Sequence, residues 1–158
     1  MKAGRTIEAM LQELARQSAA KEDYLVNTSC LVMETDGSVP TLRMAGREEV
    51  QLSPLGIRPT AHQQIGTYLG IPAKYYGKML AEDTELLAYN VNRWFQRNPE
   101  QRMLRTIDGH ARAFLSNRYR RIENLDIARF TLPRLAELDG ARVESCEVTE
   151  DRMYIKVV

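Results

Sequence analysis

Hydrophobic positions near the N-terminus follow first a helical and then a strand pattern. From Thr6 to about Ala20, apolar residues recur at helical spacing, and Thr6 is available as the N-cap. Tyr24 to Glu34 is rich in strand-forming residues. The dipeptide Asp36-Gly37 predicts a tight turn before a second strand over Thr41 to Met44. Residues 1–50 are therefore predicted to form a helix followed by a β-hairpin.

The middle of the chain is predicted to be helical. Gln51 to Thr60 contains two prolines and a glycine, which indicates a loop leading to a helix capped by Thr60. Gly70 ends that helix, and Pro72 opens a second, short helix through Leu80. We therefore expect a helix-turn-helix-like pair within residues 51–100.

A third helix completes this central segment. It begins at Asp83 or Thr84 and ends at Asn98-Pro99. Its spacing places four apolar residues on one side, namely Leu86, Leu87, Val91 and Trp94.

The C-terminal part, residues 101–158, returns to a strand pattern. A hairpin is predicted from Met103–Ile107 and Ala111–Leu115, joined by Asp108-Gly109. A helix then begins at Asn124 or Asp126 and runs through Leu138, with Pro133 inside it, before a last hairpin. That hairpin joins Arg142–Val148 to Arg152–Val158 around Glu150-Asp151. The fold class is thus α+β, with a β-β-α-β-β C-terminal unit in a single domain over residues 1–158.

Composition narrows the class of protein. The chain has 158 residues, 44% of them hydrophobic and 27% charged, which is typical of a soluble globular domain and predicts a cytoplasmic protein. Two distant cysteines, Cys30 and Cys146, are expected to be free thiols. With only two histidines and no cysteine cluster, we expect neither a conventional zinc site nor another cofactor.

Charge is distributed unevenly along the chain. The window from Arg93 to Arg134 holds ten arginines, no lysine and four acids, a formal charge of +6. Residues 1–90 sum to −2 and residues 135–158 to −3, so the net charge of +1 conceals a basic segment. Clustered guanidiniums interleaved with aromatic rings are typical of proteins that hold phosphates while stacking on bases.

The basic window contains two candidate contact sites. In the predicted 103–115 hairpin, Arg105 and Arg112 are candidate phosphate ligands and Phe114 a candidate stacking ring. The alternative is that Phe114 belongs to the core and the arginines form a solvated rim.

The second candidate is the run Asn117-Arg118-Tyr119-Arg120-Arg121, just before a predicted helix. It resembles an anion-binding junction, because a helix N-terminus adds unpaired N–H donors to its three guanidiniums. Tyr119 is a second candidate stacking ring. The alternative is that Glu123 and Asp126 neutralise the cluster.

The predicted helix pair within residues 62–80 suggests another mode of binding. In a reader of duplex DNA, the second helix would present Lys74, Tyr75 and Lys78 to the major groove. That helix is short and lacks the Arg, Gln and Asn residues that usually read bases, so simple helix packing is the competing interpretation.

Catalytic signatures are missing from the sequence. Asp108 and His110 suggest a dyad, but Asp-Gly is better explained as a hairpin turn. No Gly-rich phosphate loop, GxSxG or HExxH pattern occurs. We therefore expect a binding protein in preference to an enzyme.

Three segments resemble an uncharacterised family carried by phages and plasmids: LGIPAKYYGKML, the run from NVNRWF, and ARAFLSNRYRRIENLDI. The third is similar to the family's RAxLSxxYxxIDN-like stretch, with Glu123 where aspartate is more usual. The resemblance covers roughly residues 55–158. Because family members continue with further strands, the resemblance leads us to expect that this chain is a short or truncated member.

This resemblance implies a role in DNA replication, recombination or host interference by a mobile element. The leading hypothesis is a protein that binds or anneals single-stranded DNA, with self-association possible and no membrane partner. The alternatives are a duplex-DNA regulator using residues 62–80, or a protein–protein module acting against host defence.

Overall fold

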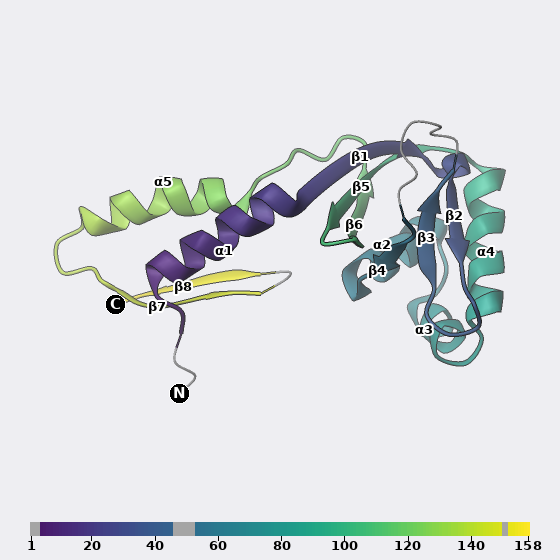
Figure 1. The fold of residues 1–158 in the computed structure, drawn as a ribbon, viewed down its shortest axis with the longest axis horizontal. Coiled ribbons are helices and arrows are strands. Elements are labelled where there is room, and N and C mark those ends of the chain that lie inside the picture. The colour runs from purple at the N-terminus through teal and green to yellow at the C-terminus, as the bar shows by residue number, and fades with distance from the viewer. Residues whose placement is uncertain (1–3, 46–52, 150–151) are drawn as a thin grey trace. The chain divides into compact units, whose positions relative to one another are not determined.

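The computed structural model describes residues 4–45, 53–149 and 152–158. In this part of the chain the helices are α1 (Ile7–Ala20), α2 (Pro59–Leu69), α3 (Ala73–Glu82), α4 (Thr84–Arg97) and α5 (Asn124–Ala136). The strands are β1 (Lys21–Asn27), β2 (Leu31–Glu34), β3 (Thr41–Met44), β4 (Leu55–Ile57), β5 (Gln101–Ile107), β6 (His110–Ser116), β7 (Val143–Val148) and β8 (Met153–Val157). This mixture confirms the α+β prediction (Figure 1).

The chain divides into two compact units. The terminal unit comprises Met1–Ala20 and Arg120–Val158, and the central unit comprises Lys21–Tyr119. Each unit has its own hydrophobic core. A single domain over residues 1–158 stays a prediction.

A six-stranded sheet forms the framework of the central unit. Its strand order is β1-β5-β6-β4-β3-β2, and every neighbouring pair is antiparallel except β4 with β6. The β5–β6 hairpin turns at Asp108 and Gly109, whose φ angles of 49° and 73° match the left-handed turn that Asp-Gly favours. The predicted hairpin is thus confirmed at the position of its turn.

Three helices share the central unit's core with this sheet. α2 packs on β6, and α4 lies along the edge strand β2 (Figure 1). The Asn92 side chain of α4 closes that edge: its Oδ1 accepts from the Met33 N–H at 2.7 Å and its Nδ2 donates to the Met33 carbonyl at 2.8 Å. A backbone edge that would otherwise be open to pairing is thereby satisfied.

Local signals set the helix ends of the central unit. Gly70 ends α2 with a φ of 68°, a left-handed conformation that glycine adopts without strain. The carboxylate of Asp83 caps α4 by accepting from the Leu86 N–H at 2.9 Å. Both ends were predicted. The predicted Thr60 cap is wrong, because α2 starts at Pro59 with Arg58 at its N-cap position, so that Thr60 lies inside the helix.

The terminal unit is built from α1, α5 and the β7–β8 hairpin. Thr6 caps α1 as predicted, since its Oγ1 accepts from the Ala9 N–H at 3.2 Å. Helix α1 contacts both β7 and α5. The core of this unit consists of Met10, Leu14, Ala128, Cys146 and Val148.

Several predicted elements need correction. The strand expected over Tyr24–Glu34 is divided into β1 and β2 by a short 3-10 turn, Thr28–Cys30. The loop expected over Gln51–Thr60 contains β4 and the start of α2, while Gln51 itself lies outside the described residues. The predicted turn at Glu150-Asp151 also lies outside them.

The predicted β-β-α-β-β unit is also not a single unit. Its first hairpin, β5–β6, belongs to the six-stranded sheet of the central unit, whereas β7–β8 forms a sheet of its own in the terminal unit.

Candidate nucleic-acid interface

Phe114 lies in the core of the central unit. It faces Leu104 in the β5–β6 register, and its side chain is among the largest that are fully buried. Its ring contacts those of Tyr68 and Phe95, with centroid distances of 5.5 and 5.8 Å. The prediction that Phe114 stacks on bases is therefore wrong, because exposing it would open the core.

Arg105 forms a buried ion pair. It lies opposite Asp23 in the β1–β5 register, and its Nε donates to Asp23 Oδ1 at 3.0 Å. The two side chains are only 4% and 8% exposed. A guanidinium held by a buried carboxylate is not available to a phosphate, which corrects the prediction for Arg105.

Arg112 lies at an irregularity of the β5–β6 pairing. The register shifts between Arg105 and Thr106, so that these residues pair with Ala113 and Ala111 and leave Arg112 without an opposite residue. The Arg112 side chain is half-buried and its Nε is shielded from solvent. Because of this shift, the side chains around Arg112 do not follow the regular alternation between the two faces of the sheet that is expected of a strand.

The segment Asn117–Arg121, called here the 117–121 segment, is solvent-exposed throughout. It leaves β6 through a turn in which the Tyr119 N–H donates to the Ser116 carbonyl at 3.1 Å. Within the described parts of the chain, no carboxylate lies at ion-pair distance from Arg118 or Arg120. This segment is the part of the predicted basic cluster that remains accessible.

Tyr119 connects this segment to the buried ion pair. The Arg105 guanidinium lies 5.8 Å from the centroid of the Tyr119 ring, within cation–π range. Tyr119 is 38% exposed. The Asp23–Arg105 pair therefore provides a fixed support for a partly exposed aromatic ring.

The junction before α5 differs from the predicted anion site. α5 begins at Asn124, as predicted, but Glu123 occupies its N-cap position. Its carboxylate places negative charge beside the helix N-terminus, where an anionic ligand would otherwise be favoured.

Arginine–aromatic contacts that were not recognised in the sequence include two in the central unit. Arg102 lies over the ring of Tyr68, with its guanidinium carbon 4.4 Å from the centroid. On α4, the corresponding carbon of Arg97 lies 5.5 Å from the Trp94 centroid, and Trp94 is 40% exposed. The helical spacing of Trp94 and Arg97 was the available signal, but Trp94 was grouped with Leu86, Leu87 and Val91 on one apolar side of the helix.

The α2–α3 pair packs closely around one glycine. A Cβ built on Gly66 would lie 2.9 Å from Cδ2 of Tyr76, so the buried Tyr76 ring occupies the space that a larger residue would need. The residues predicted to contact duplex DNA, Lys74, Tyr75 and Lys78, are all exposed on α3. Helix packing thus accounts for the glycine, and duplex binding stays a prediction.

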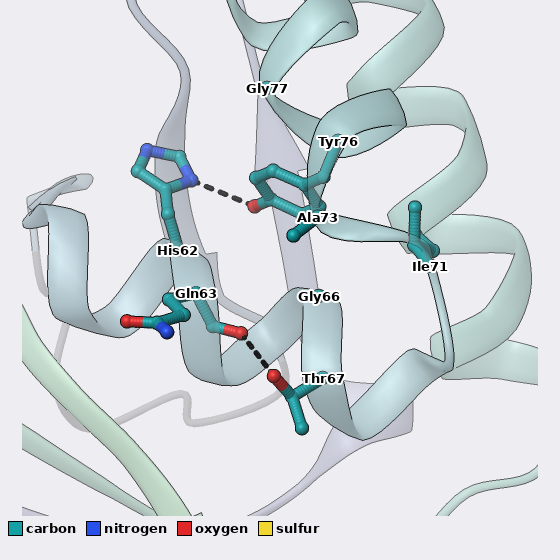
Figure 2. Close-up of a pocket in the computed structure, with 8 residues that line it drawn as sticks. All are labelled: His62, Gln63, Gly66, Thr67, Ile71, Ala73, Tyr76 and Gly77. Carbon is teal, nitrogen blue, oxygen red and sulfur yellow. Dashed lines mark hydrogen bonds between the residues drawn. The ribbon is translucent and has the colours of Figure 1, made fainter.

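A pocket of about 250 Å³ lies between these two helices (Figure 2). At one side of it, His62 Nδ1 and the Tyr76 hydroxyl share a hydrogen bond of 2.7 Å. Burial lowers the pKa of His62 from 6.5 to about 4 and raises the pKa of the Tyr76 hydroxyl. Both groups are therefore neutral at pH 7, and their hydrogen bond joins the two helices.

Asp108 and His110 flank the hairpin turn, which agrees with the interpretation of Asp-Gly as a turn. His110 Nδ1 is 2.8 Å from the backbone carbonyl oxygen of Asp108, a contact made within the hairpin turn. The described residues also contain no group of three histidine, cysteine or acidic side chains placed to hold a metal ion. Both cysteines, Cys30 and Cys146, are free thiols, as predicted.

Comparisons with models of protein families, with curated proteins and with solved structures found no match. The resemblance to a phage and plasmid family stays a prediction. Among the helices described, none has the length and apolar character needed to cross a membrane.

Proposed function

We propose that this protein binds single-stranded nucleic acid, DNA in particular, through the 117–121 segment. One observation carries the proposal: the partly exposed Tyr119 ring rests on a fixed arginine and lies between two exposed arginines without a carboxylate partner in the described chain. A ring of this kind stacks on a base, while adjacent guanidiniums bind the flanking phosphates.

A single strand fits this arrangement better than a duplex. Tyr119 needs an unstacked base, and the bases of a duplex are already stacked on each other. Arg121 is exposed beside Arg120 and extends the run of positive charge. The resemblance to mobile-element proteins supports a role for such binding in replication, annealing or recombination.

The proposal is tested with a fluorescently labelled oligothymidylate, by anisotropy over a range of salt concentrations. The double variant R118A/R120A should weaken binding, and the slope of log affinity against log salt should fall by about 1.4, since each phosphate contact to a single strand contributes about 0.7. The matched control is R129A/R142A, which removes two exposed arginines from the terminal unit.

Stacking is tested separately with Tyr119→Leu, which keeps an apolar side chain but removes the ring. Loss of one base–aromatic stack should weaken binding by about 1–3 kcal/mol. If R118A/R120A binds as tightly as R129A/R142A, with the same salt slope, the 117–121 segment is not the binding site.

A further inference from the structure

The outer face of α4 combines exposed aromatic rings with arginines. Leu87, Val91 and Phe95 point into the core and are fully buried. The opposite ridge consists of Leu86, Tyr89, Arg93 and Arg97, which are three or four residues apart and therefore align along the helix. Trp94 lies at the border between this ridge and the buried side of α4, with the guanidinium carbon of Arg97 5.5 Å from its ring centroid. We call these five residues the α4 face.

The aromatic residues of this face do not serve the core. Tyr89 is 67% exposed and Trp94 is 40% exposed, although both are large side chains that are usually buried over most of their area. Tyr89 and Trp94 are five residues apart and therefore lie about 140° from each other around the helix, with Arg93 and Arg97 on the surface between them. The exposed side of α4 is thus a broad aromatic and basic surface of the kind that another molecule covers.

The charge of the face identifies the chemistry of that molecule. Arg93 and Arg97 make no ion pair with any described carboxylate, and Glu85, in the first turn, is the sole acid of α4. A partner must therefore bring negative charge together with flat surfaces that stack on Tyr89 and Trp94. Single-stranded nucleic acid brings both.

The dimensions agree with such a partner. Tyr89 and Arg97 are eight residues apart, which is about 12 Å along a helix that rises 1.5 Å per residue. Phosphates of one strand of B-form DNA recur roughly every 3.4 Å along the helix axis, and a strand with unstacked bases is more extended, so this length covers at most about three nucleotides.

The C-terminal end of α4 and the start of the 117–121 segment lie at the same end of the β5–β6 hairpin. Thr28 Oγ1 donates to the Phe95 carbonyl at 3.1 Å, and the Thr28 N–H donates to the Glu100 carbonyl at 2.9 Å. The next residue of the chain, Gln101, starts β5, and Arg102 is paired with Ser116, the last residue of β6. Within the central unit, the end of α4 and the residues that directly follow β6 therefore lie at the end of the β5–β6 hairpin that is opposite its turn.

We infer that the α4 face is a second contact surface for single-stranded nucleic acid, extending the site at the 117–121 segment. This inference rests on the proposed function. Tyr89 and Trp94 stack on bases, and Arg93 and Arg97 bind the phosphates between them.

Trp94 provides a direct measurement, because it is the only tryptophan of the chain. Unlabelled oligothymidylate should quench its emission, with a midpoint equal to the dissociation constant from anisotropy, and added salt should reverse the quenching. R93A/R97A should lower the slope of log affinity against log salt by about 1.4, because two phosphate contacts are lost and each contributes about 0.7. Tyr89→Ala should weaken binding by about five- to 150-fold, the range of one base–aromatic stack.

The controls are R129A/R142A for charge and Tyr154→Ala, which removes an exposed tyrosine of the terminal unit. Each variant is first compared with the parent protein by thermal unfolding. Oligothymidylate binding that depends on Arg118 and Arg120 without any change in Trp94 emission would overturn this inference and leave the proposed function standing.

The remaining outcomes separate the two ideas further. Quenching of Trp94 that is unaffected by R118A/R120A would support the α4 face and refute the 117–121 segment. Equal quenching by poly-glutamate would show that the face recognises acidic chains without bases, which overturns the inference. Absence of oligothymidylate binding by both methods would refute both proposals.

Discussion

The buried Asp23–Arg105 pair offers the sharpest test of how this protein uses its arginines. We expect Arg105→Met to destabilise the central unit, because it removes the positive partner of a carboxylate that is only 8% exposed. Breaking a buried ion pair on one side costs about 3–5 kcal/mol. For a unit of this size, such a loss lowers Tm by about 12 °C or more.

The assay is chemical unfolding followed by circular dichroism, on a set of four proteins. The double variant D23L/R105M should recover most of the loss, since replacing a whole buried pair with apolar residues is often neutral or stabilising. Arg118→Met is the matched control. Because Arg118 is exposed, the stability of this variant should differ from that of the parent protein by no more than about 0.5 kcal/mol, whereas its affinity for oligothymidylate should fall.

The opposite pattern would refute this reasoning. If Arg105→Met unfolds like the parent protein but loses oligothymidylate affinity as Arg118→Met does, then Arg105 binds phosphate and is not a support for Tyr119.

Three further predictions concern the packing of the helices. Burial lowers the pKa of His62 from 6.5 to about 4, so that, as the pH falls, His62 is protonated in the unfolded chain before it is protonated in the folded protein. The free energy of unfolding should therefore fall by about 3 kcal/mol between pH 6.5 and pH 4. The variant His62→Gln should not show this loss of stability. Gly66→Ala should lower the stability of the protein by about 1–3 kcal/mol in thermal unfolding, because the new Cβ would lie 2.9 Å from the Tyr76 ring. Gly77→Ala is the matched control: its Cβ would meet nothing within 4 Å, so the substitution should stabilise α3 by about 0.5–1 kcal/mol. Asn92→Ala should cost about 1–3 kcal/mol in urea unfolding, because two backbone groups of β2 lose their partner; a loss below about 0.5 kcal/mol would show that water replaces it.

Most features that depend on a few neighbouring residues were predicted correctly, with the Thr60 cap as an exception. The caps at Thr6 and Asp83, the end of α2 at Gly70 and the Asp108-Gly109 turn all appear where expected. In each case a short side chain or a glycine satisfies the backbone of its own turn, so the signal lies within four residues.

Features that depend on distant residues were missed. Strand β4 is only three residues long, lies between two prolines, and exists because it pairs with β3 and β6. The grouping of the C-terminal elements also failed, since β5–β6 pairs with strands from the first half of the chain.

The candidate site shows the same division. Sequence alone established a basic, aromatic-containing window from Arg93 to Arg134, because charge and residue type are properties of the chain. Tertiary structure decided which of its members face solvent. Arg105 pairs with Asp23, which lies 82 positions earlier in the chain, and the Phe114 ring contacts the Phe95 ring in the core. Arg118 and Tyr119, in contrast, remain exposed. Burial is a collective property of strands and helices brought together by folding, so no local pattern distinguishes a guanidinium that binds a phosphate from one that is paired inside.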